Sequence, residues 1–279
     1  MIKQKDISSL IKHDIYEGII QRWKYYIMAI AFFIMVNTAF VIHAQAFLSA
    51  EKSTEQLGIN DLLINVMRGN FPFDPSLQKG IDLPIVWFAY HALLSLLIGF
   101  YIYDDLRGSA SSVILRVHSK TKWWTSKIIW CVFSVCLYYI LFLATCIIFI
   151  LGFGNISAGS PYVCKMFFDI SISHIENLEL FFISWGLPLI ISISISIFQI
   201  TISLIIKPLY SFFVIVCYLV ISSFYCNQAL IFNFAMVIRN SAFYSNSGIT
   251  ASAGITIALF VTILSCFAGS FFVKRKDIL

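Results

Sequence analysis

The chain has 279 residues, of which 59% are hydrophobic and only 12% are charged. Soluble domains contain about 45–50% apolar and about 25% charged residues, so this chain has too few charges to cover a water-exposed surface. The composition excludes a soluble enzyme, a disordered chain and a secreted disulfide domain, and it predicts a single polytopic membrane domain over residues 1–279.

Six apolar stretches meet or approach the length of a membrane-spanning helix and contain no Asp, Glu, Lys or Arg. A bilayer core of about 30 Å requires roughly 20 apolar helical residues. The fifth stretch has 17 residues, and either tilt or an adjoining re-entrant segment would make up the difference. Open strands leave backbone groups unpaired in lipid, so an all-α fold is expected. The predicted spans are residues 25–48, 84–103, 128–152, 181–206, 209–225 and 250–273.

Lys and Arg residues collect on one side of these predicted spans. With the N-terminus placed in the cytoplasm, the inner segments carry fourteen of the 19 basic side chains and the outer segments carry five. Inner loops of membrane proteins are enriched in Lys and Arg, so both termini are predicted to be cytoplasmic. The net charge of +5 then reflects topology and contact with membrane lipid, and no basic patch with interleaved aromatics indicates nucleic-acid binding.

Residues 1–23 form an amphipathic segment ahead of the first span. Apolar side chains recur every fourth residue, whereas Asp14, Glu17 and Arg22 fall on other faces. This pattern is typical of a helix that lies in the inner membrane interface and is held there by its apolar stripe. The stripe consists of Ile7, Ile11, Ile15, Ile19 and Trp23.

The outer loops are predicted to hold short helices that are too small for an independent domain. Residues 49–83 form the largest loop, in which Asn60 or Asp61 would cap a short helix and Gly69 would end it. Residues 229–238 are apolar but too short to span, which fits a re-entrant or interfacial helix at the outer side.

The sequence lacks the motifs of several membrane enzymes and carriers. It has no Gly-x4-Gly-Lys-Ser/Thr loop, no His-Glu-x-x-His run, and no histidine on the last three spans to serve as the base of a serine protease. No span carries an ionised group at its middle, which a coupled ion carrier usually keeps as a relay. None of the seven cysteines forms a CxxC pair, although Cys164 and Cys226 lie near the outer side and could meet. No catalytic residue, metal ligand or bound cofactor is therefore predicted.

Uncharged polar side chains form short stripes on three of the spans. They either form hydrogen bonds between helices or line part of a substrate path. His91 is the sharper case because an imidazole can ionise, so a neutral bonded histidine and a proton relay both stay open. The candidate path residues are Asn37 on the first span, His91 and Ser95 on the second, and Ser192, Ser196 and Gln199 on the fourth.

The sixth span carries small residues along one face. Small side chains let helix backbones approach closely, so this face is predicted to pack against another helix. Its members are Gly254, Ala258, Thr262, Ser265 and Gly269.

Residues 104–127 form the most informative inner loop. Asp104 and Asp105 extend the second span into the cytoplasm, and a Gly-Ser break then precedes a short helix with apolar and basic side chains. The loop re-enters the membrane at Trp123 and Trp124, whose rings suit the headgroup level.

This layout resembles the permease subunits of type 2 ABC exporters over nearly the whole chain. Members of that family often carry an acidic residue, a Gly-Ser/Thr pair, an apolar turn and a basic stretch that ends in a lysine at the third span. The chain departs from this pattern at His118, where many members have a proline-like break. The matching positions are Asp104 or Asp105, Gly108-Ser109, Val113-Ile114-Leu115, Ser119-Lys120 and Lys127, together with the basic ending Lys274-Arg275-Lys276-Asp277.

The resemblance implies that two permease subunits, identical or related, pair in a bacterial plasma membrane. Each would sit on a separate ATP-binding cassette subunit that holds ATP and Mg²⁺, so this chain itself would not be an enzyme. The loop 104–127 would contain the helix that receives ATP-driven motion, and the first and fifth spans would line the dimer interface. The implied coupling residues are Ser109, Val113, Ile114, Leu115, Arg116 and Val117.

The expected substrate of such an exporter is amphipathic, for example a peptide, a lipid or a drug, because the spans are apolar and no charged residue lines them. The alternative is a non-transporting membrane protein that anchors or regulates a partner. A neighbouring reading frame that encodes a soluble protein with a Walker motif would favour the first interpretation. A purified chain that never copurifies with an ATPase would favour the second.

Overall fold

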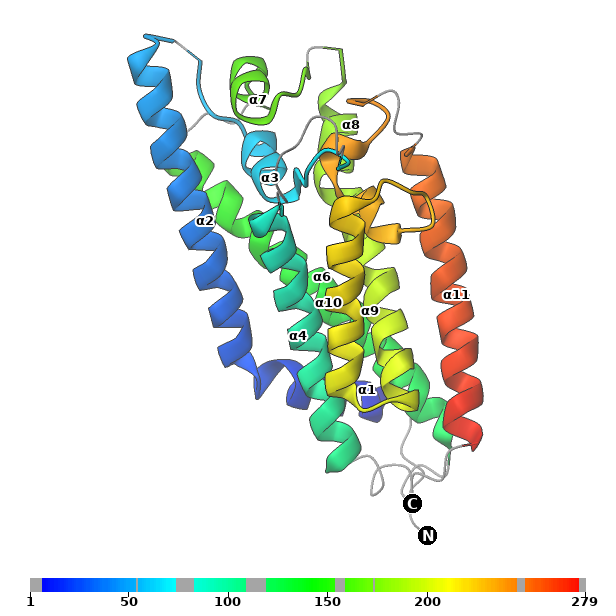
Figure 1. Ribbon diagram of the computed structural model, residues 1–279. Helices are drawn as coiled ribbons and strands as arrows, with labels where there is room; N and C mark the ends of the chain where they lie inside the picture. The colour runs from blue at the N-terminus through cyan, green and yellow to red at the C-terminus, as the bar shows by residue number, and fades with distance from the viewer. Residues whose placement is uncertain are drawn as a thin grey trace.

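The computed structural model describes residues 7–53, 55–73, 83–108, 119–153, 159–172, 174–244 and 249–275. Within these ranges the chain is helical and contains no β-strand, apart from an isolated bridge between Asn240 and Ile249. The long helices run side by side as a bundle, and several short helices gather at one end of it (Figure 1). The predicted all-α fold class is confirmed.

Five helical segments in the described ranges are long and apolar enough to cross a membrane. A sixth apolar helix, α10 (Pro208–Phe224), has only 17 residues and packs between α4 and α9 in the bundle (Figure 1). The turn before it is short because Pro208 occupies the first helical position. The five segments are α2 (Trp23–Ala50), α4 (Ile85–Arg107), α6 (Lys120–Phe153), α8 (Asn177–Phe181) continued through the π-helix η2 (Phe182–Gly186) into α9 (Leu187–Ile205), and α11 (Ala251–Arg275).

The two ends of the bundle differ. At the α1 end lie α1 (Ile7–Ile15), the start of α6 and the last turn of α11 (Figure 1). At the α3 end lie the short helices α3 (Ile59–Met67) and α7 (Pro161–Phe168), and the 3₁₀ turns η3 (Ile231–Ala235) and η4 (Val237–Arg239) (Figure 1).

Helix α3 forms where a short helix was predicted, but its cap differs. The N-cap is Gly58, and Asp61 occupies the third helical position with its side chain accepting a hydrogen bond from the Gly58 N–H at 2.8 Å. The expectation that Asn60 or Asp61 would be the cap is therefore wrong by two or three residues. Gly69 follows the helix with a φ of 72°, a left-handed conformation that favours glycine, as its predicted role as a helix stop requires.

The buried carboxylate of Asp61 joins α3 to the start of α7. It accepts hydrogen bonds from the Ser160 N–H at 3.0 Å and from the Cys164 thiol at 3.2 Å. Burial raises the pKa of Asp61 to about 6, although these hydrogen bonds oppose the rise. Cys164 and Cys226 are both free thiols, so the disulfide that the sequence left open is not formed.

The apolar segment 229–238, predicted to form a re-entrant or interfacial helix, forms the two short 3₁₀ turns η3 and η4 in place of one continuous helix. Arg239 follows, and its fully buried guanidinium donates to the carbonyl oxygens of Asn70 at 2.8 Å, Ser222 at 2.5 Å and Ser223 at 2.7 Å. The last two carbonyls belong to the final turn of α10, where the helix dipole favours a cation. Burial lowers the pKa of Arg239 to about 10, which still leaves it charged at neutral pH.

Helix α11 packs through the predicted small-residue face. Gly254, Ala258, Ser265 and Gly269 are buried, and a Cβ at Gly269 would lie 2.0 Å from the Trp124 ring. The indole N–H of Trp124 donates to the carbonyl of Cys266 at 3.2 Å, which fixes the ring against α11. The opposite face of the helix is apolar and exposed, as expected of a surface that meets lipid. Its exposed side chains include Leu259, Phe260, Ile263, Leu264 and Phe267.

The Gly269→Ala variant should lower the stability of the purified protein by about 1–3 kcal/mol, because the added methyl group overlaps the Trp124 ring. The matched control is Gly152→Ala, since no atom lies within 4 Å of a Cβ at that helical position. Thermal unfolding in detergent should show a lower melting temperature for the first variant and no loss for the second. Equal melting temperatures would contradict the packing described.

Candidate functional site

The N-terminal segment is docked onto the bundle through one face. It continues from α1 into the π-helix η1 (Tyr16–Ile20), and it buries Leu10, Asp14 and Gly18 against the protein. Ile7 and Trp23 of the predicted apolar stripe remain 37% and 55% exposed. Asp14 lies on a different face from this stripe, as predicted. The expectation that the stripe alone holds the segment is wrong, because buried Asp14 also ties it to Lys127.

Gly18 marks the closest approach between η1 and α6. A Cβ at this position would lie 2.2 Å from the indole nitrogen of Trp130, so no other residue fits without a shift of that ring. π-Helical turns of this kind are rare and occur frequently at functional sites. The close approach brings Asp14, one turn earlier, over the first turns of α6.

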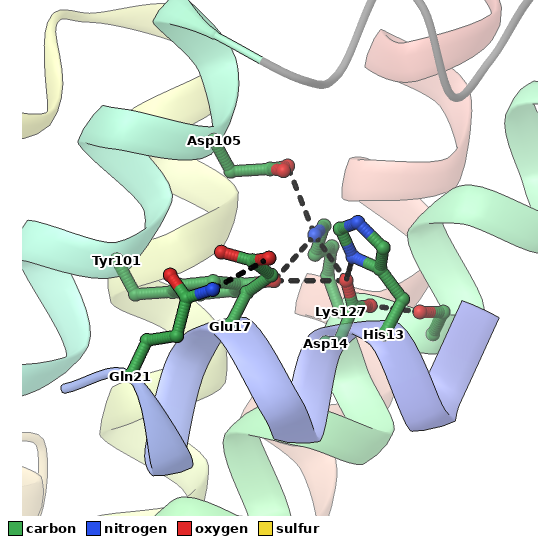
Figure 2. Close-up of polar contacts among 8 residues, drawn as sticks. His13, Asp14, Glu17, Gln21, Tyr101, Asp105 and Lys127 are labelled. Atoms are coloured by element: carbon green, nitrogen blue, oxygen red, sulfur yellow. Dashed lines mark hydrogen bonds and ion pairs between the residues drawn. The ribbon is translucent and has the colours of Figure 1, made fainter. Parts of the chain in front are cut away.

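The buried ammonium of Lys127 lies at the centre of the α1 end. Its side chain is 1% exposed, and its Nζ forms ion pairs with Asp14 at 2.7 Å and with Asp105 at 2.9 Å (Figure 2). It also donates to the phenol oxygen of Tyr101 at 3.0 Å. Three segments that are distant in sequence, α1, the end of α4 and the start of α6, therefore meet at one nitrogen atom.

Asp14 is held by further hydrogen bonds. The Tyr101 hydroxyl donates to one carboxylate oxygen at 2.8 Å, and the Ser126 hydroxyl donates to the other. The Nδ1 atom of His13 lies 3.8 Å from the same carboxylate (Figure 2). We refer to Asp14, Tyr101, Asp105, Ser126 and Lys127 together as the Lys127 cluster.

The Lys127 cluster brings two carboxylates and one ammonium together in a buried place. The desolvation cost of such groups is large, and it is offset only while every charge keeps its partners. The cluster also keeps the cation near two aromatic faces, since Nζ lies 4.7 Å from the centre of the Tyr101 ring and 5.5 Å from that of Trp123. These directional contacts fix the relative positions of α1, α4 and α6 more strictly than apolar contacts would.

The Lys127 cluster closes the base of the inner loop. Asp105 precedes Gly108, the last described residue before the loop, and Lys127 follows Ser119, the first described residue after it. A second ion pair, between Arg22 and Asp104, links the N-terminal segment to the same end of α4. The predicted coupling residues lie outside the described residues; they are Ser109, Val113, Ile114, Leu115, Arg116 and Val117.

A cleft of about 640 Å³ lies beside the Lys127 cluster. Its walls come from the N-terminal segment and the end of α4, and Gln21 on one wall donates to Glu17 at 3.1 Å (Figure 2). The lining residues are His13, Glu17, Gln21, Arg22, Tyr25, Tyr101, Asp104, Asp105 and Gly108.

The predicted path residues all lie inside the bundle, buried between helices. Gln199 on α9 and Ser95 on α4 are doubly bonded, since the amide donates to the Ser95 carbonyl at 2.8 Å and the Ser95 hydroxyl donates to the amide oxygen at 2.9 Å. Asn37 on α2 donates to the hydroxyl of Thr145 on α6 at 3.4 Å. The void beside Ser95, Ser196 and Gln199 measures only about 10 Å³.

His91 lies in the same buried layer. Its Nδ1 is 3.4 Å from the hydroxyl of Ser192, which in turn lies 2.8 Å from the hydroxyl of Tyr139. The ring packs edge-on against Trp87 and Phe232. Within a single chain these groups form hydrogen bonds between helices, and a path lined by them in an assembly stays a prediction.

Residues 72–279 match a protein family described as a protein of unknown function (DUF2705). The chain belongs to this family. No curated protein and no solved structure matches it. The family match includes Asp105 and Lys127 of the Lys127 cluster, whereas Asp14 lies before the matched residues.

Three members of the cluster in this DUF2705 chain were not predicted from the sequence as functional residues, namely Asp14, Tyr101 and Ser126. Asp105 and Lys127 were noted for their places in the loop and in the resemblance to exporter permeases, but not as an ion pair. One signal was available, because a lysine directly before an apolar run must be paired or exposed. Its partner could not be inferred, since Asp14 is 113 residues away along the chain.

The Lys127→Met variant should destabilise the protein by about 3–5 kcal/mol, because it leaves two buried carboxylates without their cation. Lys122→Met is the matched control, since this lysine lies five residues earlier on the same helix and its ammonium forms no ion pair among the described residues. Thermal unfolding of the purified protein measures both effects. Adding Asp14→Asn to Lys127→Met should recover part of the loss, and equal melting temperatures for the two lysine variants would contradict the role of the cluster.

Proposed function

We propose that this chain is the membrane-spanning permease subunit of an ABC exporter, driven by separate ATP-binding cassette subunits. The single observation that carries the proposal is the Lys127 cluster. It gives the loop 104–127 a rigid base and joins that base to the N-terminal segment. A subunit that receives mechanical work through one loop requires such a joint, because a partner shifts a conformation only through contacts that differ between two states.

The proposed topology has six spans, with the α1 end in the cytoplasm of a bacterial plasma membrane. Basic side chains at that end support this orientation. Helix α10 rises about 26 Å with its 17 residues, which nearly matches the hydrocarbon core, so it serves as the fifth span. The supporting basic residues at the α1 end are Lys12, Arg22, Lys120, Lys122, Lys207, Lys274 and Arg275.

A second permease subunit, the same or a related chain, would complete the substrate path. Apolar side chains on α2 and α10 support pairing, since they are exposed in the single chain and suit either lipid or another helix. The proposed substrate is amphipathic, in keeping with an apolar bundle whose middle holds only uncharged polar groups. Among these exposed side chains are Ile27, Met35, Ile42, Leu209, Phe213 and Ile221.

A non-transporting membrane anchor or regulatory subunit is the alternative. The burial of the predicted path residues favours it, because a void of about 10 Å³ holds no substrate. In the exporter, the path must therefore form between two subunits or open during the cycle.

The proposal is tested with Ile114→Asp in the loop, measured by copurification of the ATP-binding cassette subunit from cells that express both and by export from those cells. The charge should disrupt an apolar contact with the ATPase, so we expect loss of copurification, or hydrolysis without export, while the spans still insert. Thr121→Asp, at an exposed position of α6 beside the same loop, is the control and should keep both activities. If Ile114→Asp keeps both at the wild-type level, the coupling role is wrong and the anchor is favoured.

A further inference from the structure

We propose that a cleft at the α3 end binds an anionic amphiphile, whose charged head pairs with Arg68 and whose apolar tail lies along the start of α4. The cleft has a volume of about 220 Å³ and lies where the end of α3, the start of α4 and the end of α7 meet. It is separate from the Lys127 cluster, which lies at the other end of the bundle (Figure 1). The inference requires only that the chain sits in a membrane, so it does not depend on transport.

Arg68 lines this cleft, and contacts with other described residues use only a small part of its hydrogen-bonding capacity. One guanidinium nitrogen donates to the carbonyl of Phe167 at 3.0 Å, and the group lies 6.0 Å from the centre of the Phe168 ring. A guanidinium has five N–H donors, and no carboxylate of the described residues forms an ion pair with this one. A half-buried cation in this state favours an anionic partner that offers two oxygen atoms.

The two fully buried cations described above, Lys127 and Arg239, both have strong hydrogen-bond acceptors within the protein. Lys127 has two carboxylates, and Arg239 has the carbonyl oxygens at the end of α10. Arg68 has one carbonyl oxygen and one aromatic ring. Among the described residues Arg68 thus has no anionic partner, and the proposed amphiphile supplies one from outside the chain.

The opposite wall of the cleft is apolar and lies at the level where α4 begins. Leu83 and Ile85 are 38% and 75% exposed, and Trp87 continues the wall inward. Exposed apolar side chains at the first turn of a membrane-spanning helix face the boundary between headgroups and acyl chains. A small soluble anion would leave these apolar side chains exposed to water. An uncharged lipid would not supply an anionic partner for Arg68. A head with negative charge and an attached acyl chain satisfies both walls.

The test uses the purified, delipidated full-length protein in detergent and measures bound amphiphile by native mass spectrometry. The probes are phosphatidylglycerol, phosphatidylcholine with the same acyl chains, and oleate. We expect phosphatidylglycerol or oleate to bind more tightly than phosphatidylcholine. Arg68→Gln should weaken that binding roughly tenfold or more, because it removes a charge-assisted pair. Arg68→Lys should keep part of it, and Lys165→Gln, at an exposed position on α7, should change nothing.

A second variant tests the same cleft independently, in case Arg68→Gln does not fold. Ile85→Asp changes a side chain that is 75% exposed, and it places a negative charge at the mouth of the cleft, so it should also weaken anionic binding. Binding of phosphatidylglycerol alone would assign the site to a phosphate headgroup, and binding of oleate alone to a free carboxylate. Equal binding of phosphatidylcholine, no binding of either anionic probe, or unchanged binding in both variants would overturn the proposal.

Discussion

The ion pairs of Lys127 with Asp14 and Asp105 are the interaction on which the α1 end depends. Each of the three groups comes from a different helical segment, and each is buried, so the loss of any one leaves an uncompensated charge. Apolar burial could hold the N-terminal segment against the membrane, but it is non-directional and would permit sliding. The ion pairs make the N-terminal segment and the base of the loop one mechanical unit.

Buried charges occur in the described residues at both ends of the bundle, whereas its middle holds uncharged polar pairs such as Ser95 with Gln199. This distribution follows from the solvent, because a charge near the bilayer centre is costly and a hydrogen bond between neutral groups is not. The buried charged side chains are stabilised by different partners at the two ends. The α1 end uses opposite charges, and the α3 end uses the carbonyl oxygens of α10 to hold Arg239 and backbone N–H groups to hold Asp61.

The parts of the fold that could be predicted are those set by local pattern. Long apolar runs without charges specify long helices, and the small residues from Gly254 to Gly269 specify a packing face, because both signals lie within one segment. Asp14 was predicted only to lie on a face other than the apolar stripe, because the pattern of one segment does not show what its polar face contacts. Its burial depends on Lys127 in another helix, and the 3₁₀ turns before Arg239 likewise depend on partners in distant segments.

The Lys127 cluster restricts how the loop 104–127 can move in the proposed exporter. A force that separated Asp105 from Lys127 would leave both charges buried and without their partner. Separating the ends of α4 and α6 therefore costs more free energy than moving them together. Asp14 is bound to the same ammonium, and the close contact of Gly18 with Trp130 prevents α1 from sliding along α6. Motion delivered to the loop is therefore expected to carry the ends of α4 and α6 together with the N-terminal segment. In a regulatory anchor the same rigid unit would transmit no motion. It would hold a partner in a fixed position at the membrane surface.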